Sequence, residues 1–255
     1  MPATIGWESA ELCRAPGGDR DRELVFGDTV ICFSTVKGPH EWDWAYLQSD
    51  KDGYCGYVEM MDLGTPHKVT PVPAGQTASH QVIARQTHCY EKPDFKSDDF
   101  GRRSFGSKVI VLDETERYIE TPEGYIPKPH VAPLTELFSD PADVAAIFLG
   151  TPYLWGGNTC WGIDCSGLVQ AALLACGIPC PGDSDMQHSL GSPATGPYKR
   201  NDLLFWKGHV ALVTDTNTLI HANAATMSTT YEPIDTAIAR IAAQGDGPIT
   251  AHRRL

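Results

Sequence analysis

The chain has 255 residues, of which 42% are hydrophobic and 20% charged, and its formal net charge is −12. This composition is typical of a folded globular protein and excludes a disordered one, and the acidic charge would repel a nucleic acid. The length allows one full hydrophobic core and one or two smaller cores, so we expect two or three domains.

The N-terminal residues, Met-Pro-Ala-Thr-Ile-Gly-Trp, contain neither the cationic segment nor the apolar run of a secretory signal, and no stretch has the length and apolarity of a membrane span. We therefore expect a cytoplasmic protein without a membrane partner, whose eight cysteines remain thiols. Four cysteines are close enough in sequence to suggest zinc, but their spacing lacks the short Cys-x2-Cys pairs of structural zinc sites. They are Cys160, Cys165, Cys176 and Cys180. We expect no metal and no other cofactor.

The first 135 residues predict β structure. Between Glu23 and Leu63, short β-prone runs alternate with turn signals, which predicts five short strands that form a small barrel. A second set of such runs follows at residues 81–84, 108–113, 117–121 and 124–127. We therefore predict two small β-barrels, at residues 1–68 and 69–133, the second ending in a linker.

A proline-rich stretch separates this half from the next. Residues 127–133, Pro-Lys-Pro-His-Val-Ala-Pro, lack three amide donors and predict an extended linker, so the third domain would span residues 134–255. Asp140 and Pro141 then supply the start of a helix. We expect this helix to pack against one that follows Cys165.

The segment 153–177 contains the strongest candidate nucleophile. Glycines cluster around Cys165, and apolar residues at helical spacing follow it until Gly177 and Pro179 end the pattern. Cys165 would therefore lie on the first turn of a buried helix, where amide N–H groups and the helix dipole favour the thiolate. Cys176, on the apolar face of the same helix, is predicted to be a core residue.

A cysteine nucleophile needs a base, and the base needs an orienting group. Of the nine histidines, seven lie in turns, linkers or polar segments, where a surface position is the default: His40, His67, His80, His88, His130, His188 and His252. His209 and His221 instead lie in two β-prone runs, 209–214 and 218–222. The three residues between these runs predict a hairpin.

The register of this hairpin follows from its loop. With Asn217 in the left-handed position that three-residue loops use, Thr214 pairs with Thr218. This register places His209 and His221 on the same sheet face as diagonal neighbours, close enough for two imidazoles to interact. Such a pair, facing the cysteine, would complete a thiol–imidazole site.

Four motifs of this half resemble those of the NlpC/P60 cysteine peptidases and occur in that family's order: Pro152-Tyr-Leu-Trp-Gly-Gly157, Asp164-Cys-Ser-Gly167, Gly208-His-Val-Ala211 and Ile220-His-Ala222. The Asp-Gly-Tyr-Cys-Gly-Tyr-Val stretch at residues 52–58 resembles bacterial SH3 domains, two of which recur before such a cysteine domain. The resemblance implies an α+β fold. In it, two SH3-like barrels precede a papain-like domain, whose cysteine-bearing helix packs on an antiparallel sheet with the histidines.

The resemblance also implies a role for each motif residue. Cys165 would attack an amide carbonyl after giving its proton to His209, and His221 would accept from the other ring nitrogen of His209 and fix its tautomer. The hydroxyl of Tyr153 would stabilise the oxyanion together with the Cys165 amide. The alternative for Tyr153 is a buried aromatic position beside Trp155.

Substrate contacts are implied in the same way. Asp164 and Ser166, which flank the nucleophile, would contact the substrate. In relatives with tandem SH3 domains, an Asp-Ser pair and a tyrosine of the first SH3 domain hold the free α-amine of the peptide's L-Ala. Three residues fit these roles: Asp183, Ser184 and Tyr54. Gly182 stands where the family has Arg, and Asp183 could equally be a turn or cap residue.

We therefore hypothesise a monomeric cysteine peptidase of murein peptides. It would hydrolyse the bond from γ-D-Glu to an L-diamino acid in free tri- or tetrapeptides with an unblocked L-Ala, in cell-wall recycling. Two alternatives remain. One is a hydrolase of intact peptidoglycan stem peptides, and the other is a non-catalytic protein whose SH3-like domains bind peptide. The sequence leaves the choice between diaminopimelate and Lys open.

Overall fold

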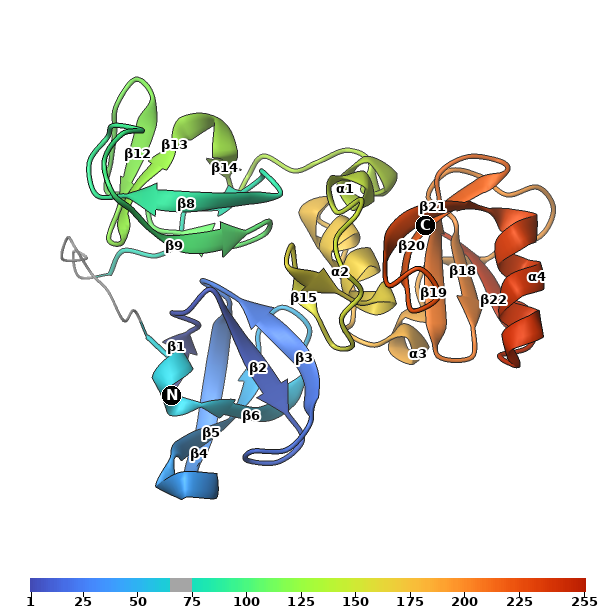
Figure 1. Cartoon of the computed structure of the whole chain (residues 1–255), viewed down its shortest axis with the longest axis horizontal. Coiled ribbons are helices and arrows are strands. Elements are labelled where there is room, and N and C mark those ends of the chain that lie inside the picture. The colour runs from blue at the N-terminus through green and yellow to red at the C-terminus, as the bar shows by residue number, and fades with distance from the viewer. Residues whose placement is uncertain (65–74) are drawn as a thin grey trace. The chain divides into compact units, whose positions relative to one another are not determined.

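The computed structural model describes residues 1–64 and 75–255, and the chain divides into two compact units, Met1–Glu136 and Leu137–Leu255. Figure 1 shows the elements of both units. The expected boundary between residues 68 and 69, like His67, lies outside the described residues.

The first β region of the N-terminal unit is a six-stranded antiparallel sheet in the order β1-β4-β5-β6-β2-β3. Its strands are β1 Pro2–Thr4, β2 Ser9–Cys13, β3 Arg20–Val25, β4 Thr29–Lys37, β5 Asp43–Ser49 and β6 Cys55–Glu59, with 3-10 turns at Pro39–Glu41 and Met60–Asp62. The sheet encloses a core of aliphatic side chains, including Ile5, Leu12, Leu24, Leu47 and Val58. The strands β1 and β2 were not predicted, because β2 (Ser-Ala-Glu-Leu-Cys) lacks the β-branched and aromatic residues that indicate a strand.

The second β region of this unit contains two sheets, β10-β7-β14 and β11-β12-β13-β8-β9. Their strands are β7 His80–Val82, β8 Gln86–Tyr90, β9 Asp99–Ser104, β10 Lys108–Val109, β11 Asp113–Glu114, β12 Tyr118–Thr121, β13 Gly124–Pro127 and β14 Val131–Pro133. Both sheets contribute to one core, which includes Val82, Cys89, Val109, Ile119 and Ile126.

The prediction of an extended linker at residues 127–133 is wrong. Lys128–His130 forms a 3-10 turn, and β14 pairs with β7, with Ala132 opposite Gln81. β14 is an edge strand of its sheet, where a missing proline amide breaks no ladder hydrogen bond. The proline-rich stretch is therefore a sheet edge, and the boundary between the two units follows it, between Glu136 and Leu137.

Phe26 connects the two β regions. It follows β3 in the first region, yet its side chain packs in the core of the second. The guanidinium carbon of Arg103 lies 3.7 Å from the centre of the Phe26 ring. The Phe26 carbonyl accepts a hydrogen bond of 3.0 Å from the Lys108 amide. The two β regions therefore share one buried aromatic side chain.

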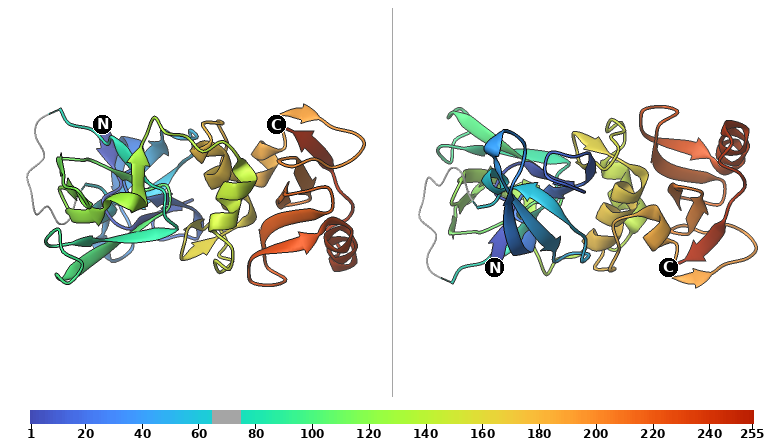
Figure 2. Two further views of the ribbon diagram at one scale, coloured as in Figure 1. Left: turned by 90° about the horizontal axis from the view of Figure 1, so that it is seen from above. Right: turned by 90° about the horizontal axis from the view of Figure 1, so that it is seen from below.

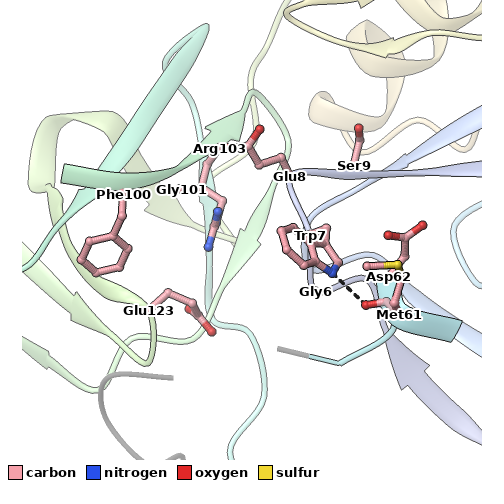
Figure 3. Close-up of a pocket in the computed structure, with 10 residues that line it drawn as sticks. All are labelled: Gly6, Trp7, Glu8, Ser9, Met61, Asp62, Phe100, Gly101, Arg103 and Glu123. Atoms are coloured by element: carbon pink, nitrogen blue, oxygen red, sulfur yellow. Dashed lines mark hydrogen bonds between the residues drawn. The ribbon is translucent and has the colours of Figure 1, made fainter. Parts of the chain in front are cut away.

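A cavity of about 830 Å³ lies in the N-terminal unit. Figure 3 shows its lining, where Trp7 Nε1 donates to the Met61 carbonyl over 2.7 Å. Burial raises the pKa of Asp62, in the same wall, to about 6. The cavity contains none of the site residues that the sequence predicts.

The C-terminal unit is built on a six-stranded antiparallel sheet in the order β17-β22-β18-β19-β20-β21. Its strands are β17 Ser192–Pro193, β18 Leu203–Trp206, β19 His209–Val213, β20 Thr218–Asn223, β21 Ser228–Pro233 and β22 Ala251–Arg254, and its helices are α1 Pro141–Ile147, α2 Cys165–Ala175, α3 Ser184–Gln187 and α4 Ile234–Gln244. A small hairpin, β15 Asn158–Thr159 and β16 Gly162–Ile163, precedes α2. Figures 1 and 2 show α1 and α2 on one face of the sheet and α4 on the other.

The start of α1 and its packing agree with the prediction. Asp140 caps the helix by accepting a 2.9 Å hydrogen bond from the Ala142 amide, and Pro141 occupies the first turn. The helix packs against α2, as expected. Val144 and Phe148 are fully buried at this contact.

The predicted register of the β19–β20 hairpin is confirmed. Leu212 lies opposite Ile220 and Val213 opposite Leu219, the pairing that the three-residue loop implies. The predicted left-handed Asn217 is wrong, because Asn217 is absent from the positive-φ residues of the described chain. Its amide instead donates to the Asp215 carboxylate over 2.8 Å, so a side-chain hydrogen bond closes the loop.

Candidate active site

Cys165 is the first residue of α2, as predicted, and it is 7% exposed. The backbone amides of Cys165, Ser166 and Val210 face the sulfur and favour its anion. Burial and the neighbouring Asp164 carboxylate outweigh them and raise the pKa of the thiol to about 12. Burial therefore opposes the thiolate that the sequence predicts and favours the neutral thiol.

Asp164 and Ser166 use their side chains within the protein. Asp164 Oδ1 accepts from the Gly167 amide over 2.6 Å and from the Ser166 hydroxyl over 3.0 Å, and Oδ2 accepts from the Gly156 amide over 3.0 Å. Both residues are buried. These hydrogen bonds fix the turn that presents the sulfur, and the role of both residues as substrate contacts stays a prediction.

The two histidines of the hairpin form a pair. His209 Nε2 lies 3.0 Å from His221 Nδ1, within hydrogen-bond distance. Burial, the mutual repulsion of the rings and the charge of Arg240 lower the pKa of His209 to about 3, and burial together with Arg240 does the same for His221. Both imidazoles are therefore neutral at physiological pH, so one nitrogen of the pair donates and the other accepts.

The pair occupies the sheet face that carries α4. Ala211, Val213 and Leu219 pack against α4, and side chains alternate along a strand, so His209 and His221 share that face. This corrects the expectation that the rings face the cysteine-bearing helix. The sulfur approaches β19 from the side of α2, at the amide of Val210.

His209 is the first residue of β19, so its ring lies at the end of the strand beside that amide. Within the described part of the chain, neither imidazole is hydrogen-bonded to the Cys165 thiol. Catalytic hydrogen bonds are often long in a substrate-free site and shorten when substrate binds.

Tyr153 lies close to Cys165. Burial and the proximity of Cys165 and Asp164 raise the pKa of its hydroxyl. Its amide donates to the Met227 carbonyl over 2.9 Å, which holds the residue against the loop before β21. Trp155 is 66% exposed, so Tyr153 has no buried aromatic neighbour there.

Asp183 and Ser184 lie at the start of α3, in a loop that a buried side chain holds in place. Asp183 precedes the helix without capping it through its side chain. The fully buried Gln187 donates from Nε2 to the carbonyls of Ser166 over 2.9 Å and Pro181 over 3.0 Å. Gln187 thus joins this loop to the first turn of α2.

Glu232 and Arg240 extend the histidine pair and were also missed. Glu232 Oε2, on β21, lies 3.1 Å from His221 Nε2, although the N–H direction departs from that of a regular hydrogen bond. Arg240, on α4, holds both carboxylate oxygens of Glu232 with a fork of 3.0 and 2.7 Å. No sequence pattern predicts this contact, because Glu232 and Arg240 belong to no motif around the histidines.

Tyr54 belongs to the N-terminal unit. Its ring packs against the core of the first β region, and the Arg22 guanidinium carbon lies 5.8 Å from the ring centre. Tyr54 is therefore half-buried. Its role in amine binding stays a prediction.

Cys176 is half-buried and ends α2 rather than lying in the core, because the helix stops one residue earlier than the apolar pattern suggests. All eight cysteines are free thiols. Among residues 1–64 and 75–255, no group of three or more His, Cys, Asp or Glu side chains is placed to hold a metal ion. No helix in this part of the chain is long and apolar enough to span a membrane.

Comparison with known proteins identifies the family of the chain. Residues 150–241 match the NlpC/P60 family, and residues 12–63 match the bacterial dipeptidyl-peptidase Sh3 domain. The γ-D-glutamyl-L-lysine dipeptidyl-peptidase of Bacillus subtilis (strain 168) is 31% identical over 223 residues, which cover 78% of this chain and 71% of that protein. The chain belongs to the NlpC/P60 family.

Other NlpC/P60 relatives agree with this assignment. Dipeptidyl-peptidase 6 of Lysinibacillus sphaericus is 26% identical over 220 residues, which cover 79% of each chain. An NlpC/P60 family protein from Bacillus cereus has the same fold, with a TM-score of 0.77 and 20% identity over 100% of this chain and 99% of that chain. One SH3 domain is identified in this way, and the predicted second SH3 domain is not.

The NlpC/P60 match contains Tyr153, Cys165, His209 and His221. The SH3 match contains Tyr54.

Proposed function

We propose that the protein is a cysteine peptidase of murein peptides, with Cys165 as nucleophile, His209 as base and His221 as the residue that orients the base. The observation that carries this proposal is the 3.0 Å imidazole pair at the start of β19, where the next amide, that of Val210, faces the Cys165 sulfur. Few arrangements other than a thiol–imidazole site use these three groups together.

The atoms that carry protons in the free site define the mechanism. His209 uses Nε2 toward His221, which leaves Nδ1 to take the thiol proton. Because the free site holds a neutral thiol and neutral imidazoles, this proton transfer accompanies the attack of sulfur on the carbonyl carbon. His209 then gives the proton to the departing amine as the C–N bond breaks. A water that His209 deprotonates finally cleaves the thioester.

The oxyanion needs donors while sulfur is bonded to the carbonyl carbon. The Cys165 amide, at the N-terminus of α2, and the Tyr153 hydroxyl are the groups we propose for it. The phenol suits this role because its raised pKa keeps it protonated, and therefore a donor, throughout the physiological range.

We propose that the scissile bond joins γ-D-Glu to an L-diamino acid in free murein peptides with an unblocked L-Ala, in cytoplasmic cell-wall recycling. Two relatives are named γ-D-glutamyl-L-lysine dipeptidyl-peptidase, which supports this bond. Asp183 and Ser184 would hold the α-amine, because Gln187 ties their loop to the first turn of α2. We also propose that the second β region is a second SH3-like domain, since its sheets enclose a core, to which Phe26 of the first region also contributes.

Paired substrates test the proposal. We expect the protein to release L-Ala-D-Glu from L-Ala-γ-D-Glu-meso-diaminopimelate, and to cleave the N-acetylated peptide at least tenfold more slowly, because the acetyl group removes the ammonium that a carboxylate can bind. Chromatography of the products measures both rates. Equal rates would exclude amine recognition. Faster release of peptide from intact sacculi would instead favour the wall hydrolase.

Cysteine variants separate catalysis from binding. Cys165→Ala should abolish turnover while the far-UV circular dichroism stays unchanged. Cys176→Ala, at the half-buried end of the same helix, is the matched control and should keep full activity. If the unmodified protein cleaves no murein peptide, the peptidase proposal fails and the binding module remains.

A further inference from the structure

The half-buried ion pair of Glu232 and Arg240 lies behind His221, the residue that we propose to orient the base. Glu232 Oε2 is 3.1 Å from His221 Nε2, and His221 Nδ1 is 3.0 Å from His209 Nε2. A continuous row of polar atoms therefore runs from α4 through β21 and β20 to the first residue of β19. The His221 side chain is fully buried, so bulk water does not compete for its nitrogens.

This row determines where the hydrogens lie. Two unprotonated atoms with lone pairs would repel at 3.1 Å, so Nε2, beside the Glu232 carboxylate, carries the hydrogen of the His221 ring, although the N–H direction departs from that of a regular hydrogen bond. A neutral imidazole has one hydrogen, which leaves His221 Nδ1 as an acceptor. His209 must then donate from Nε2, and its Nδ1 is left bare.

We infer that Glu232, held by Arg240, is a positioning residue that fixes the tautomers of both imidazoles and so keeps His209 Nδ1 free to accept the Cys165 proton. This inference rests on the proposed function for its catalytic consequence, although the tautomers themselves exist in the free protein. A carboxylate behind a histidine commonly fixes ring orientation and tautomer in this way.

Arg240 holds the carboxylate by hydrogen bonds, and its charge also lowers the pKa of both rings. It holds both oxygens of Glu232 in a fork, which prevents the carboxylate from rotating away. The charged and titratable groups that act on the imidazoles are Glu232 on β21, Arg240 on α4 and, for His209, the ring of His221. Of these, only Glu232 offers an acceptor to His221 Nε2 within the described residues.

Nitrogen-15 NMR of the histidine rings tests the inference without substrate. At pH 7 the unmodified protein should show one tautomer for each ring of the pair, with Nε2 protonated in both. In Glu232→Gln the side-chain amide can present either oxygen or NH2 to His221, so both tautomers of His209 should appear. The kcat should fall tenfold or more while KM changes less than threefold, because the base is wrongly protonated in part of the population.

A second variant and a control complete the test. Arg240→Gln keeps the carboxylate, so it should keep the Nε2-protonated tautomers and raise the pH at which the rings take up a second proton. Asp235→Asn, an exposed substitution at the start of α4, should change neither spectrum nor rate.

Unchanged ring tautomers in a folded Glu232→Gln protein would overturn the inference. So would a pair that is Nδ1-protonated in the unmodified protein. Both results can be read even if no peptide is cleaved, so they are distinct from failure of the proposed function.

Discussion

At the scale of single residues, buried side chains organise the site through hydrogen bonds within the protein. The amide of Gln187 binds two carbonyls from different segments, and Asp164 binds two amides and a hydroxyl in the turn before the nucleophile. A buried polar side chain costs little folding free energy while it is hydrogen-bonded. Removing it costs much more, because the polar atoms that it had bonded stay buried without a partner.

A substitution of Gln187 measures this free-energy cost directly. Gln187→Leu keeps the side-chain volume but leaves the carbonyls of Ser166 and Pro181 without their donor, so we expect a loss of about 2 kcal/mol in the free energy of unfolding. Urea unfolding measures it. Met186→Ala, at a 51% exposed position of the same short helix, should cost less than about 0.5 kcal/mol. An equal loss in both variants would contradict the assignment.

The sequence predicts those site residues that belong to a short motif, and it does not predict those that contact the site only after folding. Cys165 and His209 stand in short motifs, and the loop length alone set the pairing of the strands. The thiol pKa could not be predicted, because it depends on how much solvent the folded protein removes from the sulfur. Glu232 could not be found either, since its contacts with His221 and Arg240 arise only when three elements assemble.

At the scale of elements, the C-terminal strand β22 is fastened to β18 by one buried carboxylate. Asp202 accepts from His252 Nε2 over 2.6 Å and from Arg254 Nη2 over 2.6 Å, and its other oxygen accepts from Arg254 Nε over 2.8 Å. His252, predicted as a surface histidine, is therefore part of an ion cluster. Burial alone would raise the pKa of Asp202, but these hydrogen bonds lower it to about 2.

This cluster predicts an acid-dependent stability. The folded pKa of Asp202 lies below its ordinary value of 3.8, so its contribution of about 2 kcal/mol is present above pH 4 and is lost as the pH falls toward 2. Asp202→Asn should remove that contribution at pH 7. The difference in unfolding free energy between the two proteins should then shrink between pH 4 and pH 2.

Urea titrations at several pH values test this element-scale prediction. Asp246→Asn, in the exposed turn after α4, is the control and should follow the unmodified protein at every pH. A difference between Asp202→Asn and the unmodified protein that persists at pH 2 would show that the carboxylate acts through packing rather than through charge.

At the scale of the whole molecule, each unit has its own core, but the N-terminal unit is not two independent barrels. Phe26 leaves the first β region and is 4% exposed within the core of the second, under the Arg103 guanidinium. Phe26→Ala should therefore destabilise the N-terminal unit by about 3–5 kcal/mol, the usual cost of deleting a buried aromatic ring. The loss should extend to the second β region.

Hydrogen exchange locates that loss. Amides of β12 and β13 should exchange faster in Phe26→Ala, although the substitution lies in the other β region. Phe33→Ala removes the same ring from a 57% exposed position of β4 and should leave those amides unchanged. Protection unaltered in β12 and β13 would mean that the two regions fold separately.

The shared ring sets a limit on how this architecture can be recombined. Suppose that the first β region is replaced by that of a relative without an aromatic residue after its third strand. The core of the second β region would then contain a cavity, and the Arg103 guanidinium would lose the ring on which it stacks. The smallest interchangeable module is therefore the entire Met1–Glu136 segment. Insertions or swaps that respect this limit should be tolerated, whereas those that cut just before Phe26 should yield aggregation-prone chains.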